Sequence, residues 1–495
     1  MGFHEDFAFE TEIKKWPTDE LITILSKNSI HYIQRGGNQL MKNYYIEEPT
    51  VQNIPNLKKK PFKTFLAPWD MITIEYYSVC FSSDYRKSRR STISNLVSCF
   101  QNSNYLESIA SSITEDPDNL FFYLFGMSAE QFNLQTPSMY LRAFNRNFHI
   151  LYGSQKIRRY LSIEISDIIK QTIGISIENF MKSIILIFAC CLQNPDPYIG
   201  FDSYYRDRQN ILDIKRDFDK VLALYTSDYS TIRSSKYGRK QLEITPFIKT
   251  QKDSKIIMSS LLSVFQMVGN SLYWLVRNIF YSKAEIQQEF TNAFGLMFED
   301  YVIEYCEYCN FPIEKIPEQK YKSVDLKFEN ENYIVLIEVK SLILNLLGKN
   351  QNPNIEDLKV FYKRGISEAS EQIESTLRNI DNPQDKRVIS LILLYDSLFA
   401  ADFLLNIDLE RFKRNNMFAV GIDSFENWVV LFSDNKEAFN QMLSNLHYCE
   451  NQRDNRGFSK TLENYKEYFH VTTIPEWDYF HIFLNKIIID SSQDR

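Results

Sequence analysis

Two charged side chains, Glu338 and Lys340, end the otherwise apolar segment 333–341. The segment has the apolar and β-branched composition of a strand, and the period of two along a strand places both charges on one face. A charged group at the end of a buried strand loses hydration, so it needs an ionic or hydrogen-bonding partner or a functional role. We therefore consider Glu338 and Lys340 candidates for chemistry rather than for packing.

A third charged side chain, Asp325, lies on the preceding strand of an expected hairpin. A turn centred just after residue 330 places Asp325 opposite Leu336, on the same face as Glu338 and diagonal to it at roughly 7 Å. Two carboxylates at this separation can bind one Mg²⁺ ion, which takes oxygen ligands at about 2.1 Å. Lys340 would then orient an attacking water or offset the charge of a reacting phosphate. A register shift of one residue would move Asp325 to the other face and abolish the site.

The order of Asp325 and the Glu-Val-Lys segment 338–340 on one hairpin resembles the PD-(D/E)XK nuclease superfamily. The core of that superfamily runs helix, three strands, helix, strand, and residues 284–400 are expected to follow this order. Val324 stands where the name of the superfamily has Pro, a residue that many members lack.

Two flanking helices extend the resemblance. Many members carry an acidic residue on the helix before the hairpin, in a pattern like Gly-x-x-Phe-Glu, and Glu299 ends such a pattern here. Many also carry a Gln on the helix after the hairpin, a position that Gln372 occupies. By the resemblance, Glu299 would support a metal or its water, and Gln372 would orient Lys340 or the phosphate.

The resemblance implies metal-dependent hydrolysis of phosphodiester bonds in nucleic acid, with DNA the expected substrate and an endonuclease the expected enzyme. Mg²⁺ or Mn²⁺ would be the cofactor, and Lys340 would position the nucleophilic water. The implied catalytic residues are Asp325, Glu338, Lys340, Glu299 and Gln372, and the implied metal ligands are Asp325, Glu338 and the carbonyl of Val339.

The elements that must position these residues divide the chain into three expected parts. Residues 1–280 show helical spacing with few turn signals, which predicts an α-helical region for substrate recognition or regulation. Residues 284–435 are expected to form the nuclease domain, and residues 436–495 a helical extension that packs on the core. The expected fold class is therefore multidomain α+β, with a helical region followed by a restriction-endonuclease-like α/β core that has a mixed central sheet.

Within the core, the apolar run 387–395 is typical of a central strand that is covered on both faces. The segment 355–380 has helical spacing, and residues 284–309 form an earlier helix with an apolar stripe. The expected strands are 311–316, 322–328, 333–341, 387–395, 417–422 and 428–432.

The overall charge does not by itself indicate a nucleic-acid partner, because 56 Lys and Arg face 63 Asp and Glu, a net charge of −7. Basic residues nevertheless cluster locally in the helical region. The clusters are Lys58, Lys59, Lys60 and Lys63; Arg86, Lys87, Arg89 and Arg90; Arg142, Arg146, Lys156, Arg158 and Arg159; and the segment 231–256. Each could be an ordinary solvated face, and together they could form a phosphate-binding track.

Cysteine usage and the apolar segments indicate a reduced, cytoplasmic protein without a membrane partner. Seven cysteines form an odd set in a long chain, which is not typical of a secreted disulfide framework. The first residues are acidic where a secretory signal is basic. The longest apolar run, 183–192, is about half the length that a bilayer requires, so we interpret it as a buried core helix.

A helical region joined to such a nuclease resembles prokaryotic anti-phage defence effectors, and this role rests on analogy alone. One alternative is a non-catalytic nucleic-acid-binding or assembly protein with a degenerate nuclease fold. Another is a repair or transposition nuclease that is directed by a partner. Cutting both strands with one site per chain would favour a homodimer, and a defence enzyme could need a separate partner or trigger protein.

Overall fold

The structure is a computed structural model in which helices predominate and strands form three sheets among the described residues. It describes residues 2–34, 45–47, 63–86, 91–105, 119–131, 137–193, 198–205, 209–317, 319–349, 353–382, 384–396, 398, 401–451, 457–470 and 474–490. Of the predicted basic residues, Lys58, Lys59, Lys60, Lys87, Arg89 and Arg90 lie outside these ranges.

A five-stranded mixed sheet occupies the C-terminal half, with the strand order β10-β9-β8-β7-β6. The strands are β6 (Ile313–Lys315), β7 (Leu326–Glu329), β8 (Tyr333–Lys340), β9 (Arg387–Leu394) and β10 (Met417–Gly421). β9 pairs in parallel with β8 and β10, while β6, β7 and β8 pair antiparallel. The predictions of a mixed sheet and of a central strand at 387–395 are confirmed.

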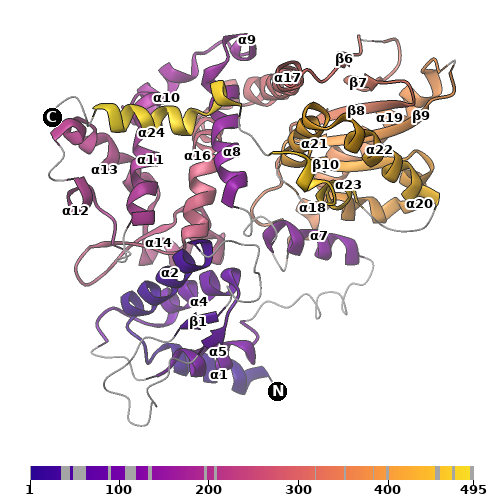
Figure 1. Cartoon of the computed structure of the whole chain (residues 1–495). Helices are drawn as coiled ribbons and strands as arrows, with labels where there is room; N and C mark the ends of the chain where they lie inside the picture. Colours follow the sequence, from indigo (N-terminus) through magenta and orange to yellow (C-terminus); the bar gives the residue numbers. More distant parts are fainter. Residues whose placement is uncertain are drawn as a thin grey trace.

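Helices cover both faces of this sheet (Figure 1). The helices are α17 (Ala284–Tyr308), α18 (Ile355–Tyr362), α19 (Glu368–Asn379), α20 (Leu409–Arg414), α21 (Ile422–Asp434), α22 (Lys436–Asn451) and α23 (Phe458–Glu463). Even-numbered side chains of β8, such as Leu336, share an apolar cluster with Ile373 of α19. Odd-numbered ones, such as Ile337, share a cluster with Met297 of α17. The two charged residues at the end of β8 therefore continue the face that α19 covers.

Residues 428–432, predicted as a strand, lie inside helix α21, so that prediction was wrong. The run Trp-Val-Val-Leu-Phe has the composition of a strand. However, Phe425, Trp428 and Leu431 recur at helical spacing and are buried, and Trp428 packs on Phe439 of α22. The predicted helix 355–380 exists as α18 and α19, joined by a π-helical turn.

The residues before α17 are mainly helical, as predicted, with two small sheets added. The longer helices are α1 (Gly2–Ile13), α2 (Thr18–Gln34), α4 (Pro68–Phe81), α5 (Ile93–Gln101), α7 (Leu120–Gln131), α8 (Pro137–Phe148), α10 (Ile165–Ile173), α11 (Ile177–Gln193), α13 (Lys215–Leu224) and α16 (Leu261–Tyr281). The small sheets contain β1 (Tyr45–Glu47) with β2 (Lys63–Phe65), and β3 (Thr226–Asp228), β4 (Phe247–Lys249) and β5 (Ile256–Met258). α16 is central, because it packs on α8, α11 and α17 and so connects the helical region to the sheet.

The apolar run 183–192 lies in α11, and its Ile184 and Ile187 are completely buried in the core. Among the described residues no single helix is long and apolar enough to span a membrane. Only the pair α10 and α11 reaches that length and apolarity together, and it is bent by 67°.

The C-terminal helices contact both halves of the molecule. α22 and α23 pack against the sheet and α21. The last helix, α24 (Tyr479–Asp490), crosses to the helical region and packs on α8 and α11 (Figure 1). The segment after residue 435 thus covers the sheet with its first helices and the helical region with its last.

Candidate active site

The β7–β8 hairpin brings Asp325 next to Glu338. Leu326 pairs with Ile337, so Asp325, one residue before β7, lies directly beside Glu338 rather than diagonal to it. The pairing differs by two residues from the predicted register because the side chain of Asn330 accepts the N–H groups of Asn332 and Tyr333 and places the turn later. A shift of two preserves the face, so the two carboxylates still point the same way.

Glu338 is a buried carboxylate with one oxygen in use. The side chain is 1% exposed, and the Lys340 ammonium donates to its Oε1 at 2.6 Å. Its Oε2 is buried and has no hydrogen-bond partner within the described part of the chain. Burial, with a contribution from the charge of Asp325, raises the pKa of Glu338 to about 8. A buried carboxylate oxygen without a partner is unfavourable unless it is protonated, accepts a hydrogen bond or coordinates a cation.

Asp325 is fixed in place by the backbone of the neighbouring strand. Its Oδ2 accepts the N–H of Val339 at 2.8 Å. Burial raises the pKa of Asp325 to about 6; the Val339 N–H opposes this rise, and the charge of Glu299 adds to it. The backbone contact aligns Asp325 with residues 338 and 339, which are the other two predicted ligand positions.

Lys340 bridges the sheet and the helix after it. Besides its bond to Glu338, its Nζ donates to Oε1 of Gln372 on α19 at 2.8 Å. Gln372 faces β8 because the even-numbered residues of that strand lie under α19. The predicted contact between the lysine and the downstream glutamine is therefore present, and it fixes the ammonium between two acceptors.

Glu299 lies on α17 at the rim of the same site. Its Oε1 is 2.5 Å from Nζ of Lys315 on β6. Its charge contributes to the raised pKa values of both Asp325 and Glu338, which places it near them. The adjacent Asp300 accepts hydrogen bonds from Arg159 and Tyr160 of the helical region, at 3.0 and 2.8 Å.

The donor set fits a hard divalent cation. The available donors are oxygens, two of the carboxylates adjoin, and each has a raised pKa that a cation between them would lower. Within the described ranges no group of three or more His, Cys, Asp or Glu side chains is placed to hold a metal. Mg²⁺ commonly uses one or two carboxylates, with waters and phosphate oxygens completing its shell, so the pair with the Val339 carbonyl suffices.

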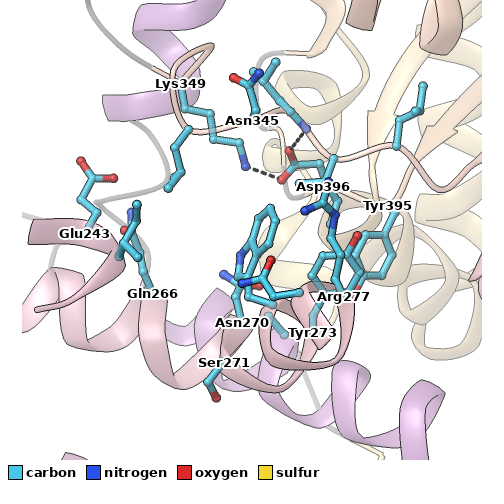
Figure 2. Close-up of a pocket in the computed structure, with 18 of the residues that line it drawn as sticks. Glu243, Gln266, Asn270, Ser271, Tyr273, Arg277, Asn345, Lys349, Tyr395 and Asp396 are labelled. Atoms are coloured by element: carbon cyan, nitrogen blue, oxygen red, sulfur yellow. Dashed lines mark hydrogen bonds and ion pairs between the residues drawn. The ribbon is translucent and has the colours of Figure 1, made fainter. Parts of the chain in front are cut away.

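A cavity of about 1510 Å³ adjoins the site, and Val339 and Lys340 form part of its wall. One side is α16, and the other is the segment 341–349 that follows β8 (Figure 2). Asp396, which sequence reasoning missed, holds this segment. Its two oxygens accept from Lys349 Nζ at 2.6 Å and from the Leu344 N–H at 2.9 Å. Its position just after the buried strand β9 was the signal that could have identified it.

Three residues of the predicted basic clusters at 142–159 and 231–256 are buried in ion pairs instead of facing solvent. Arg146 is buried and bound to Asp423 and Glu426 of α21. Arg239 and Lys240, within the segment 231–256, are buried against Glu130. These three residues cannot contribute to a solvent-facing phosphate track, because their charges are already neutralised, while the other Lys and Arg residues of the segment 231–256 are exposed. The track itself stays a prediction. Arg159, which is 54% exposed, remains at the rim of the site.

Comparisons of the chain with protein-family models, curated protein sequences and solved structures found no match.

Proposed function

We propose that the protein is a metal-dependent nuclease that hydrolyses phosphodiester bonds in nucleic acid, with DNA as substrate. The observation that carries the proposal is the contact set at the end of β8. A buried carboxylate, Glu338, has one oxygen on Lys340 and one oxygen free, with Asp325 beside it. The arrangement of sheet and flanking helices supports a restriction-endonuclease-like core, in which this set occupies the catalytic position.

In the proposed site, Asp325, Glu338 and the carbonyl of Val339 hold Mg²⁺ or Mn²⁺. When bound, the ion supplies Lewis-acid polarisation of the phosphate and a bound water of lowered pKa. Lys340 offsets charge on the phosphate and orients the water, since its ammonium is already held at the site. Gln372 positions Lys340 through the contact at 2.8 Å, and Glu299 holds a negative charge at the rim.

Energetics favour a functional site over a relic of one. An unsatisfied buried polar group costs about 1–3 kcal/mol, and more when it is charged. Replacing a buried ion pair with apolar residues is often neutral or stabilising, so binding of nucleic acid alone does not require the Glu338 carboxylate. The free oxygen is therefore better explained by a ligand that arrives with function. Prokaryotic defence against foreign DNA, and assembly as a homodimer or with a trigger protein, belong to the same proposal.

The direct test is cleavage. Plasmid, linear duplex and single-stranded DNA, and RNA, are incubated with the wild type in Mg²⁺, Mn²⁺ or EDTA, together with Glu338→Ala and Lys340→Ala. Glu314→Ala is the matched control, because Glu314 forms an exposed ion pair with Lys327 on the same sheet. We expect metal-dependent cleavage by the wild type and the control, and a loss of at least about 100-fold in the two site variants. Equal cleavage by wild type and site variants would overturn the proposal.

A further inference from the structure

The cavity beside Lys340 is larger than the sites that usually bind a single small molecule. Its volume of about 1510 Å³ exceeds the roughly 300–1,000 Å³ that is usual for small-ligand sites. Its two walls come from α16 and from the segment 341–349, so it separates the helical region from the sheet (Figure 2). The dimensions suit several consecutive units of a polymer that extends from the candidate active site.

One face of α16 provides flat and hydrogen-bonding side chains to this cavity. Gln266, Asn270, Trp274, Arg277 and Tyr281 all line it, and their spacing places them on the same side of the helix. The Arg277 guanidinium lies 5.2 Å from the Trp274 ring centroid and 4.0 Å from that of Tyr281. Figure 2 shows Gln266, Asn270 and Arg277 directed toward the hollow, across from Lys349.

Three cations of the lining have no carboxylate partner among the described residues. They are Arg277 of α16, Arg364 of the π-helical turn after α18, and Lys236 of the loop after helix α14 (Tyr229–Ser234). The other basic residues at the wall, Lys349 and Lys240 among them, are ion-paired. Positive charge that is free to meet an anion therefore reaches the cavity from three separate elements.

We propose that this cavity binds an unpaired nucleic-acid strand. Its bases would stack on Trp274 and Tyr281, and its phosphates would meet Arg277, Arg364 and Lys236. Aromatic rings next to unpaired cations are the means by which proteins hold single strands, since every base has a face that can stack. In a duplex those faces are already stacked on each other, so a double helix could not use this lining.

Only the direction of the bound strand, which would lead toward the candidate metal site, rests on the proposed function. Val339 and Lys340 belong to the same wall, so a strand in the cavity leads one phosphate to the candidate metal site. Binding itself needs neither the metal nor cleavage. The two ideas can therefore fail separately.

The test measures binding of fluorescein-labelled dT12, rU12 and a 12-base-pair duplex by anisotropy, with full-length Glu338→Ala protein in EDTA. We expect dT12 or rU12 to bind more tightly than the duplex. In that background, Trp274→Ala should weaken single-strand binding by about 5- to 100-fold, and Trp274→Phe should retain most of it. Changing Arg277, Arg364 and Lys236 together to Ala should reduce the slope of log affinity against log salt by about 2. The matched control changes the exposed Arg216, Lys436 and Lys460 together to Ala, because these three residues lie outside the lining of the cavity.

Thermal unfolding verifies that each variant is folded. If Trp274→Ala does not fold, the binding of the triple variant of Arg277, Arg364 and Lys236 still tests the inference. Equal affinity for duplex and single strand, no binding at all, or insensitivity to both variant sets would overturn the inference. Cleavage by the wild type with unchanged single-strand binding in the cavity variants would leave the nuclease proposal standing and reject the cavity. Single-strand binding without any cleavage would support the cavity inference and reject the nuclease proposal.

Discussion

Arg146 connects the wall of the cavity to the sheet, and its replacement should loosen that connection. The side chain is 3% exposed on α8; its Nε donates to Glu426 at 2.8 Å, and one terminal nitrogen donates to Asp423 at 2.7 Å and to Glu426 at 3.0 Å. Arg146→Met removes the cation and leaves two buried carboxylates on α21 without their main partner. Breaking a buried ion pair in this way costs about 3–5 kcal/mol.

Hydrogen–deuterium exchange is the suitable assay, because it reports local opening in a chain of several parts. A loss of 3–5 kcal/mol corresponds to exchange that is about 10²- to 10⁴-fold faster in the peptides of α8 and α21. Adding Asp423→Asn and Glu426→Gln to Arg146→Met removes the stranded charges while keeping an acceptor for the Tyr301 hydroxyl, which donates to Glu426 at 2.8 Å. This triple variant should exchange more slowly than the single one.

Arg216→Met is the control, since Arg216 lies exposed on α13, and it should leave both peptides unchanged. The reasoning is refuted if Arg146→Met accelerates exchange by less than about fivefold. It is equally refuted if the triple variant is no better protected than the single one, because the loss would then not come from unpaired buried charge.

Two further predictions concern pH and positioning. Asp402 accepts the N–H groups of Ala419 and Phe458, and burial raises its pKa from 3.8 to about 7. Its contribution to stability is therefore fully present below pH 4 and is lost as the pH rises through 7, by up to about 4 kcal/mol. Urea unfolding should show this decline, and Asp402→Asn should flatten it; parallel pH profiles would contradict it. Gln372→Ala should reduce cleavage about 10- to 100-fold while Gln372→Glu, which keeps an acceptor for Lys340, retains more activity; equal activities would show that Gln372 does not position the lysine.

The local pattern of the hairpin could be predicted from the sequence, and its register could not be fully predicted. Alternation along 333–341 correctly placed Glu338 and Lys340 on one face, because that depends only on the period of a strand. The pairing of Asp325 depends on the turn. The Asn330 side chain places the centre of that turn one residue later than predicted, which shifts the pairing by two residues. The site survived this error because a shift of two leaves each side chain on its face.

Two other places show what the sequence leaves open, because composition can be read locally whereas contact partners cannot. Residues 428–432 have a strand's composition, yet packing of Trp428 on Phe439 selects a helix. Arg146 belongs to a basic cluster in the sequence, yet its acidic partners lie 277 and 280 residues away on α21. Contacts at such separations are created by the fold, so no local pattern reveals them.

The most direct test of the central claim is Mn²⁺ binding, followed by electron paramagnetic resonance of the free ion. Wild type, Glu338→Gln and the control Glu314→Gln are titrated with Mn²⁺ and then with competing Mg²⁺. We expect wild type and control to bind one ion per chain at this site, displaceable by Mg²⁺, and Glu338→Gln to bind it at least about tenfold more weakly. Equal binding by Glu338→Gln and wild type, or no binding by the wild type at millimolar Mn²⁺, would contradict the claim that Asp325 and Glu338 form a divalent-cation site.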